Sequence, residues 1–309
     1  MKFKGADVIS IREFSKDDIV HILDVARTMV PAAMGEKVNT TLSDRILATL
    51  FFEPSTRTRL SFETSMLRLG GKVVSVQDPR TASAVKGETL SDTIRMVESY
   101  SDLIVLRHPQ EGSARLAAEF SSKPVINAGD GAGQHPTQTL LDLFTIREEK
   151  GTLDDVNVAF VGDLKYGRTV HSLSHALALF GAKLTFVAPP TLQMPREVVS
   201  GVKGHGVEPR STSRLEDVIP DADVLYVTRI QKERFPDLNE YDKVAGAYKV
   251  DREALSGCKS SLTIMHPLPR VTEISPEIDR SPHAAYFRQA FNGIPVRMAI
   301  LSLISGVVE

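Results

Sequence analysis

The sequence predicts an α/β fold made of two doubly wound parallel-sheet domains joined by helices. Three observations lead to this prediction. The chain has 309 residues, more than a single hydrophobic core usually organises. Short, continuously apolar segments rich in β-branched residues recur along it, as expected of strands covered on both faces. Segments with helical periodicity separate them, which is typical of βα units and parallel sheet.

The order of the elements supports two domains. Ser15 caps a first helix, because acidic residues follow it and an apolar stripe begins at Ile19. The predicted strands are Ile46–Phe52, Val73–Val76, Leu103–Leu106, Val125–Ile126, Val156–Val161, Leu184–Val187, Val224–Val227 and Leu262–Met265. We expect one domain over 1–135, a connecting helix over 136–150 and a second domain over 151–289. A terminal helix over 290–309 is expected to pack back on the first domain.

Composition excludes several classes of protein. Lys and Arg number 37 against 39 Asp and Glu, so the formal charge of -2 predicts no nucleic-acid or membrane-surface partner. No signal peptide or membrane-spanning run is found, which predicts a cytoplasmic chain. The lone cysteine, Cys258, excludes an intrachain disulfide and a Cys-rich metal cluster, and we interpret it as a structural thiol.

Polar clusters follow five of the predicted strands. Ligands of open parallel sheets bind beyond the carboxyl ends of the strands, so these clusters are the candidate site. They are Ser55-Thr56-Arg57-Thr58-Arg59, Arg107-His108-Pro109, Gly162-Asp163, Thr228-Arg229 and His266-Pro267-Leu268-Pro269.

The first cluster predicts a phosphate site. It stands where a strand ends and a helix begins, and a helix N-terminus offers unpaired amides and a positive dipole end. Hydroxyls and an arginine fork add donors for phosphate oxygens. Two arginines in a first turn oppose the helix dipole, which disfavours a plain helix start.

A glycine-rich stretch predicts a second part of the site. Asn127 to Gln138 runs through glycines that let backbone approach a ligand closely and reaches His135 and Pro136 at the start of a helix. Here the His135 ring can donate to an oxygen. Arg107 lies at a strand end, where the sequence is equally compatible with an ordinary surface arginine. The loop around Lys86 is likewise compatible with a mobile segment that has no role in the site.

The segment Gly162 to Thr169 invites other interpretations. It differs from the phosphate-loop pattern G-x-x-x-x-G-K-S/T by Arg168 in place of lysine, and no G-x-G-x-x-G dinucleotide pattern exists. His171 and His175 lie four residues apart, but without a third ligand a zinc site is disfavoured. Arg168, Arg229 and Gln231 suit a substrate that carries carboxylates. The two prolines around Leu268 predict carbonyls held in a fixed direction, through a cis bond as one option.

Motifs spread from about residue 50 to 295 resemble the aspartate/ornithine carbamoyltransferase family. They are FEPSTRTRLSFE, KGETLSDT, RHPQEG, the loop ending in QHPTQTLLDL, VGDLKYGRTVHSL, TRIQKERF and HPLPRVTEI. HPLPR resembles the aspartate branch, whereas ornithine enzymes typically carry an HCLP-like segment. The resemblance implies a carbamoyl phosphate-binding first domain, an aspartate-binding second domain and carbamoyl transfer to L-aspartate in de novo pyrimidine biosynthesis.

The resemblance also implies a role for each candidate residue. Ser55, Thr56, Arg57 and Thr58 would hold the phosphate; Thr58, Arg107 and His135 would polarise the carbamoyl oxygen; Gln138 would bind the carbamoyl nitrogen; and Arg168, Arg229, Gln231, Pro267 and Leu268 would hold aspartate. Lys86 would act in a neighbouring subunit's site and contact both substrates there. Ser83 lies three residues before this lysine where the family often has serine four before, and Ala82 stands at that position.

Assembly and cofactors follow from the same resemblance. It implies a homotrimer with shared active sites, a separate zinc-containing regulatory chain as a further partner, and no metal or cofactor in the catalytic chain itself. The alternatives left open are a carbamoyltransferase for ornithine or another amine, a nucleotide-binding enzyme and a non-catalytic anion-binding subunit.

Overall fold

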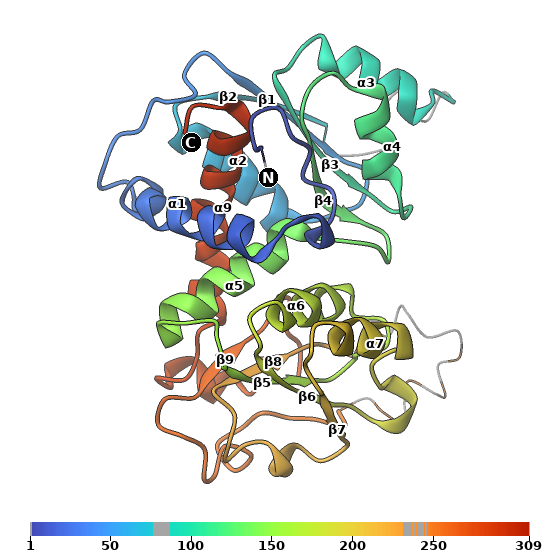
Figure 1. Ribbon diagram of the computed structural model, residues 1–309, viewed down its shortest axis with the longest axis vertical. Coiled ribbons are helices and arrows are strands. Elements are labelled where there is room, and N and C mark those ends of the chain that lie inside the picture. Colours follow the sequence, from blue (N-terminus) through green and yellow to red (C-terminus); the bar gives the residue numbers. More distant parts are fainter. Residues whose placement is uncertain are drawn as a thin grey trace. The chain divides into compact units, whose positions relative to one another are not determined.

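The computed structural model describes residues 2–76, 87–230 and 246–308, together with Asp237, Asn239, Tyr241 and Val244. The chain divides into two compact units (Figure 1). Unit 1 comprises Met1–Phe144 and Phe291–Glu309, and unit 2 comprises Thr145–Ala290. Each unit has its own parallel sheet, so the predicted fold class is confirmed. The division falls within helix α5, Pro136–Lys150.

Unit 1 contains a four-stranded sheet in the order β2-β1-β3-β4. The strands are β1 Ile46–Phe51, β2 Lys72–Val76, β3 Leu103–His108 and β4 Val125–Asp130. The helices are α1 Lys16–Met34, α2 Thr56–Arg68, α3 Leu90–Glu98, α4 Ser113–Phe120 and most of α9, Tyr286–Ser305. Figure 1 shows α3 and α4 on one side of this sheet and α2 and α9 on the other.

The first helix begins as its sequence predicts. The Ser15 hydroxyl accepts a hydrogen bond from the Asp18 amide at 3.2 Å, and the Asp18 carboxylate accepts one from the Ser15 amide at 2.9 Å. This reciprocal pair is a capping box. Gly35, at φ +83, ends the helix in the left-handed conformation that glycine adopts without steric cost.

Strand β2 differs from its expected environment. Its apolar sequence predicts a strand covered on both faces, yet it lies at the edge of the sheet with Val74 45% exposed. On the neighbouring helix α2, Leu60 is 48% and Leu67 62% exposed. Apolar side chains are therefore left uncovered within the single chain around α2 and β2.

Unit 2 contains a five-stranded parallel sheet in the order β7-β6-β5-β8-β9. The strands are β5 Asn157–Val161, β6 Lys183–Val187, β7 Arg210–Thr212, β8 Val224–Val227 and β9 Thr263–Met265, and the helices are α6 Arg168–Ala178 and α7 Arg196–Gly204. The short polar edge strand β7 was not among the predicted strands. Short 3-10 turns lie at Ile11–Glu13, Pro190–Leu192, Leu215–Asp217 and Pro276–Arg280.

The two faces of the unit 2 sheet are covered differently. On one face Phe160 packs against Phe186 and Tyr226, with ring centroids 6.0 and 5.6 Å apart. On the other, Val161 and Leu225 join a cluster with Tyr248, Ile278 and further residues from irregular segments. Turns and loops therefore cover much of one sheet face.

Each sheet has one point at which the strand order reverses. In unit 1 the chain runs from β1 outward to β2 and then returns to β3 on the other side of β1. In unit 2 the reversal lies between β5 and β8. Such switch points are where open α/β sheets bind ligands.

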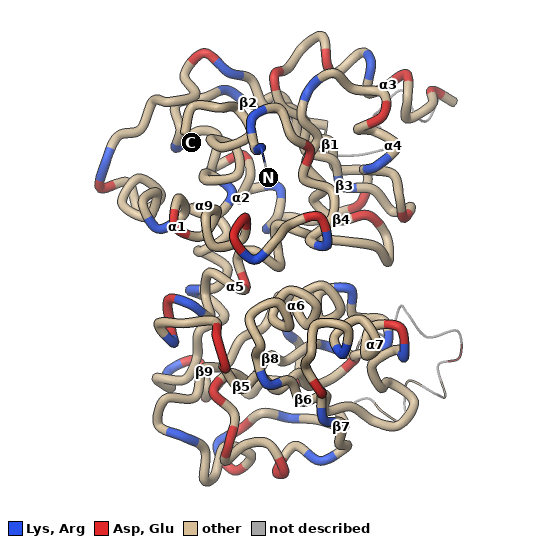
Figure 2. Tube along the Cα trace, viewed as in Figure 1, with Lys and Arg blue, Asp and Glu red and all other residues tan. Residues whose placement is uncertain are grey.

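Charge is distributed over both units. Figure 2 shows Lys and Arg interspersed with Asp and Glu in both units, mainly on the helices and connections, while most of the strands carry little charge. Among the described residues, no helix is both long enough and apolar enough to cross a bilayer.

Candidate functional site

The phosphate-site candidate lies at the switch point of unit 1. Strand β1 ends at Phe51, which pairs with Arg107 of β3, and helix α2 begins five residues later at Thr56. Ser55 occupies the N-cap position but its side chain makes no capping hydrogen bond. No described residue accepts from the backbone amides of Thr56, Arg57 or Thr58. Amides, hydroxyls and the positive helix end are thus available together for an anion.

The two arginines of this turn have different surroundings. Arg59 Nη1 lies 3.2 Å from Glu63 Oε1, one helical turn away. Glu63 is itself fixed by the hydroxyls of Thr49, at 3.2 Å, and Ser75, at 2.9 Å. Among the described residues none pairs with the exposed Arg57. The helix start therefore compensates one arginine internally and leaves the charge of the other for a ligand.

Arg107 is buried at the end of β3 and held in place by its neighbours. Its Nη1 donates to the Ala128 carbonyl at 3.0 Å, and its Nη2 forms an ion pair with Glu53. Its Nε has no partner among the described residues. Because its guanidinium is tied to both flanking segments of the sheet edge, Arg107 is a fixed positive group rather than a mobile surface side chain.

The glycine-rich stretch after β4 is packed against the protein's own atoms. A Cβ on Gly131, at φ +52, would lie 2.5 Å from the Pro109 carbonyl oxygen. The Asp130 carboxylate accepts from the amides of Gln134, at 2.7 Å, and Gly112, at 2.9 Å. Gly131 and Asp130 therefore pack this loop closely against the connection between β3 and α4. His135 is buried immediately before α5, and its carbonyl accepts from the Gln138 amide at 3.0 Å.

Gln138 has a defined orientation. Its Nε2 donates to Asp142 Oδ1 at 2.9 Å, one turn along α5. A carboxylate can only accept, so the amide nitrogen must face Asp142 and the amide oxygen must face away. This leaves the Gln138 oxygen as an acceptor, as required for binding an N–H group such as the carbamoyl nitrogen.

A buried arginine joins the two helices that carry these groups. Arg297 of α9 donates from Nη1 to the Ser61 hydroxyl of α2 at 2.7 Å, and its Nη2 lies 3.5 Å from the Thr137 hydroxyl of α5. Its guanidinium lies over the Phe62 ring, 4.8 Å from the centroid. Burial lowers the pKa of Arg297 to about 9, and Asp142 opposes this shift. Arg297 thus ties the middle of α2 to the start of α5.

In unit 2, the ends of β5 and β8 meet closely at the switch point. A Cβ on Gly162, at φ +118, would lie 2.2 Å from the Thr228 carbonyl oxygen. The Thr228 hydroxyl donates to the Val161 carbonyl at 3.2 Å. Arg168 begins α6 just after β5, and Arg229 follows Thr228. Two arginines therefore flank the switch point of this sheet.

The near-match to a phosphate loop does not form an anion cradle. The buried Asp163 carboxylate accepts from the amides of Lys165, at 3.2 Å, and Tyr166, at 2.9 Å. These loop amides are the donors that a phosphate would need, and the carboxylate adds a repelling charge. Because the Asp163 carboxylate already accepts from the amides of this loop, the geometry argues against a nucleotide-binding site here.

The two histidines of α6 do not converge on a metal. The His171 Nε2 lies 2.7 Å from the Leu164 carbonyl, while the His175 ring packs edge-on against His205, with centroids 4.8 Å apart. In the described part of the chain, no group of three His, Cys, Asp or Glu could hold a metal ion. Cys258 is partly buried against the unit 2 core, as its interpretation as a structural thiol predicts.

Two family models match the chain in succession. The carbamoyl-P binding domain of aspartate/ornithine carbamoyltransferase matches residues 6–148, and its Asp/Orn binding domain matches residues 154–304. The chain belongs to the aspartate/ornithine carbamoyltransferase family. The resemblance found in the motifs is thereby confirmed.

Relatives within this carbamoyltransferase family span the whole chain. The aspartate carbamoyltransferase catalytic subunit of Methanocella arvoryzae is 57% identical over 308 residues, covering 99% of both chains. That of Methanosarcina acetivorans is 54% identical over 309 residues, covering 100% of both. Among solved structures, the catalytic subunit of M. jannaschii aspartate transcarbamoylase has a TM-score of 0.91 at 54% identity, covering 99% of both chains. Aspartate transcarbamoylase from Trypanosoma cruzi, in complex with carbamoyl phosphate and aspartate, has a TM-score of 0.93 at 42% identity, covering 98% of this chain and 97% of the other.

Three residues that the family resemblance brings forward lie outside the described residues. They are Lys86, Ser83 and Gln231. The others fall in two sets. Ser55, Thr56, Arg57, Thr58, Arg107, His135 and Gln138 lie at the carboxyl edge of the unit 1 sheet, and Arg168, Arg229, Pro267 and Leu268 at that of unit 2.

The sequence pattern did not identify the residues that support this carbamoyltransferase site. Glu53 contacts Arg107 from 54 positions away, and Arg297 of α9 reaches α2 and α5 from the far end of the chain, so nothing in local spacing indicates them. Glu273 lies only seven residues after His266, but in an irregular segment where no helical or strand periodicity relates the two. Asp142 is different, because it follows Gln138 by four residues on one helix face, a spacing that predicts the contact.

Proposed function

We propose that this chain is an aspartate carbamoyltransferase, which transfers the carbamoyl group of carbamoyl phosphate to the amine of L-aspartate. The products are N-carbamoyl-L-aspartate and phosphate. The observation that carries the choice of aspartate is the pair of arginines, Arg168 and Arg229, beside the unit 2 switch point. Aspartate presents two carboxylates to two guanidinium groups, whereas the cationic side chain of ornithine would meet like charge.

Carbamoyl phosphate is assigned to unit 1. The phosphate binds at the N-terminus of α2 with Ser55, Thr56, Arg57 and Thr58. Backbone amides and an arginine that have no partner among the described residues support this assignment. The carbamoyl nitrogen donates to the Gln138 amide oxygen. This oxygen faces away from Asp142, because the Gln138 amide nitrogen donates to the Asp142 carboxylate.

The reaction needs neither a covalent enzyme intermediate nor a metal step. The aspartate amine attacks the carbamoyl carbon, a C–N bond forms, and a tetrahedral oxyanion develops. Thr58, Arg107 and His135 donate to this oxygen, and each such donor is worth roughly 10²–10³ in rate. The C–O bond to phosphate then breaks, the phosphate leaves with that electron pair, and the amine proton passes to a phosphate oxygen. Arg57 and Lys86 stabilise the leaving phosphate, and holding the two substrates together supplies much of the remaining rate.

The proposed assembly is a homotrimer in which Lys86 of one subunit completes the site of the next. The uncovered apolar side chains of Leu60, Leu67 and Val74 support an interface over α2 and β2. A zinc-containing regulatory chain is a further proposed partner, since the relatives are named catalytic subunits. The product would enter de novo pyrimidine biosynthesis.

An amine panel tests the activity. The purified protein is given radiolabelled carbamoyl phosphate with L-aspartate, L-ornithine or another amino acid. We expect labelled carbamoyl-aspartate and release of phosphate in equal amounts. Product with ornithine but not with aspartate would overturn the proposal.

The neighbouring arginines of α2 provide a matched pair of variants. Arg57→Ala should lower kcat/KM for carbamoyl phosphate by at least two orders of magnitude, because a charge-assisted contact contributes about 1.5–3 kcal/mol before transition-state effects. Arg59→Ala removes the pair with Glu63, whose side chains are 22% and 17% exposed, and leaves the charge of Arg57 in place, so its effect on carbamoyl phosphate should be far smaller. Equal losses in the two variants would remove phosphate binding from this turn.

A further inference from the structure

The segment after β9 holds an unusual backbone conformation. Leu268 has φ +56, and among the described non-glycine residues only Asp155 shares a positive φ. The following Leu268–Pro269 peptide bond is cis, as the proline-rich motif allowed. A left-handed conformation costs a leucine about 1–2 kcal/mol, so neighbouring groups must hold it.

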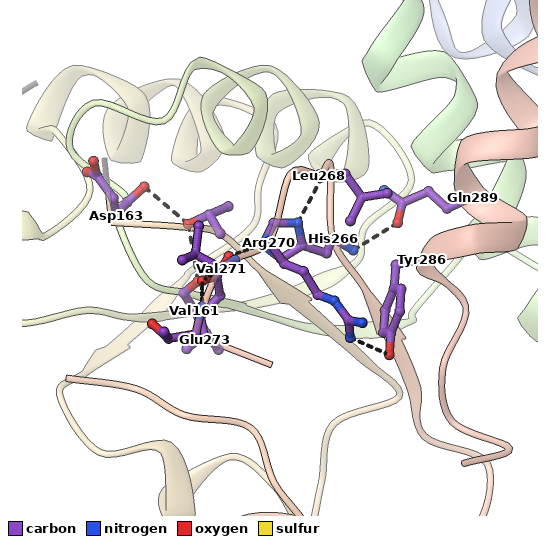
Figure 3. Close-up of polar contacts among 11 residues, drawn as sticks. Val161, Asp163, His266, Leu268, Arg270, Val271, Glu273, Tyr286 and Gln289 are labelled. Carbon is purple, nitrogen blue, oxygen red and sulfur yellow. Dashed lines mark hydrogen bonds and ion pairs between the residues drawn. The ribbon is translucent and has the colours of Figure 1, made fainter. Parts of the chain in front are cut away.

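His266 is the group that holds Leu268. The Leu268 amide donates to His266 Nδ1 at 2.8 Å, and His266 Nε2 lies 2.7 Å from Glu273 Oε1. Figure 3 shows the imidazole between these two partners. The His266 backbone amide donates to Gln289 Oε1 at 2.8 Å, and the residue is only 2% exposed. Both ring nitrogens are therefore used inside the protein.

These partners define one protonation state of the ring. An amide N–H can only donate, so Nδ1 must carry a lone pair; an ionised carboxylate can only accept, so Nε2 must carry the proton. A second proton, on Nδ1, would point at the Leu268 N–H and break that contact. The Leu268 conformation thus depends on a neutral His266 in a single tautomer.

The surrounding groups maintain this state. Burial would raise the pKa of Glu273, but hydrogen bonds from His266 and from the Val271 amide outweigh it and hold the pKa at about 2. Glu273 Oε2 accepts from Val271 at 3.1 Å and from Thr272 at 3.0 Å. Burial lowers the pKa of His266; Arg270 and Arg229 add to this effect and Glu273 opposes it.

Arg270 is occupied by partners of its own. Its Nη2 lies 2.5 Å from Asp279 Oδ2, and its Nη1 lies 3.1 Å from the Tyr286 hydroxyl. The guanidinium also lies over the Tyr286 ring, 5.0 Å from the centroid. Arg270 therefore pairs with Asp279 and Tyr286 and does not compete for the hydrogen bonds that His266 makes with Leu268 and Glu273.

We propose that His266 is a positioning residue for aspartate, and that its neutral ring, aligned by Glu273, fixes the Leu268 amide and thereby the direction of the Pro267 and Leu268 carbonyls. This inference rests on the proposed function, in which those carbonyls accept from the aspartate amine. Holding the amine by carbonyls aims its lone pair, so the effect falls on both the aspartate KM and kcat.

Two substitutions at the same buried position separate the two ring contacts. In His266→Asn the amide oxygen stands near the Nδ1 position and can accept from Leu268. In His266→Gln the amide reaches the Nε2 position and Glu273 instead. Both variants lose the ring, so a purely structural role would affect them alike. Folding of each is checked by circular dichroism and denaturant midpoint.

The expected result is selective. His266→Gln should raise the aspartate KM about 10-fold or more, the factor that one lost hydrogen bond of ordinary strength produces. His266→Asn should retain most of the aspartate affinity. The KM for carbamoyl phosphate, whose ligands lie in unit 1, should stay within about 2-fold in both. Equal aspartate KM values in the two variants, or parallel changes for both substrates, would overturn the positioning role.

A measurement on the unaltered protein does not depend on the variants folding. With 15N-labelled histidine, nitrogen shifts should show His266 protonated at Nε2 alone at neutral pH. On acidification the aspartate KM should rise as Nδ1 takes up a proton, while binding of inorganic phosphate should not follow that step. A ring protonated at Nδ1 at neutral pH would refute the proposal. Failure of the proposed function is distinguishable, because then the wild-type protein itself would not carbamoylate aspartate.

Discussion

Gly162 provides a sharp test of the unit 2 geometry. Replacing it with alanine places a Cβ 2.2 Å from the Thr228 carbonyl oxygen and 2.8 Å from its hydroxyl, at a φ of +118. The neighbouring backbone cannot yield easily, because Gly162 donates to Val187 at 3.1 Å and Thr228 donates to Val161 at 2.8 Å. The clash therefore involves the ends of β5 and β8, whose backbones are already fixed by these hydrogen bonds.

The expected cost has two parts. A non-glycine residue in such a backbone region costs of order 1–3 kcal/mol, and forcing a packed backbone apart costs roughly another 1–3 kcal/mol. Gly162→Ala should therefore lower the free energy of unfolding by about 2–6 kcal/mol. Because Arg229 follows Thr228 directly, the aspartate KM should rise as well.

Gly201 supplies the control in the same unit. It lies within α7, and an added Cβ would meet nothing within 4 Å. Gly201→Ala should raise stability by about 0.5–1 kcal/mol, because alanine loses less backbone entropy in a helix.

Guanidinium denaturation followed by circular dichroism measures both variants, with m-values compared to check that the transition is unchanged. The opposite signs are the test. If Gly162→Ala is as stable as wild type, the close approach of β5 and β8 is wrong.

Three further predictions concern assembly, ligands and pH. Mixing the inactive variants Lys86→Ala and Arg57→Ala should restore activity. In the proposed trimer, some sites of a mixed assembly would combine an intact Arg57 from one subunit with an intact Lys86 from its neighbour. If hybrids confirmed by native mass spectrometry stay inactive, Lys86 acts in the site of its own chain. Isothermal titration with ATP and magnesium should show no heat at site stoichiometry, since Asp163 takes the loop amides; a tight signal lost on mutating Arg168 would revive a nucleotide site. The free energy of unfolding should fall as pH drops below about 6.5, because the pKa of His266 is lowered in the folded protein and the unfolded state therefore binds a proton on this histidine first. The stability that Glu273 contributes is fully present above about pH 4.5 and is lost as pH falls toward its folded pKa of about 2. Denaturant midpoints from pH 8 to 4 check the direction, and a flat profile would contradict it.

The strands, and the places where polar residues follow them, could be predicted from sequence because both signals are local. A β-branched apolar run followed by polar residues marks a strand and its carboxyl end, and parallel topology then brings those ends to one edge. The exceptions have physical causes. Strand β7 has only three residues, Arg210–Thr212, and pairs along one side, so it needs little apolar character. Strand β2 has that character but lies at an edge, where chain topology decides its exposure.

The supporting contacts could not be predicted, because they join residues far apart in the chain. Arg107 meets Glu53, and Arg297 meets Ser61 of α2 across 236 positions. No periodicity relates such pairs. The role of such a residue is not evident from local sequence either: a buried arginine at helical spacing in an apolar segment gives no indication that it contacts two other helices.

The assignment of each substrate to its unit follows from one difference between two similar turns. Both turns connect a strand at a switch point to a helix, and both contain an arginine. In unit 2 the buried Asp163 carboxylate occupies the Lys165 and Tyr166 amides and places negative charge in the turn. In unit 1 the amides of Thr56, Arg57 and Thr58 have no acceptor among the described residues. A phosphate dianion needs several donors at one point and is repelled by a fixed carboxylate. In the proposed function the two carboxylates of aspartate instead pair with guanidinium groups, and Arg168 and Arg229 follow the two strands that flank the second switch point.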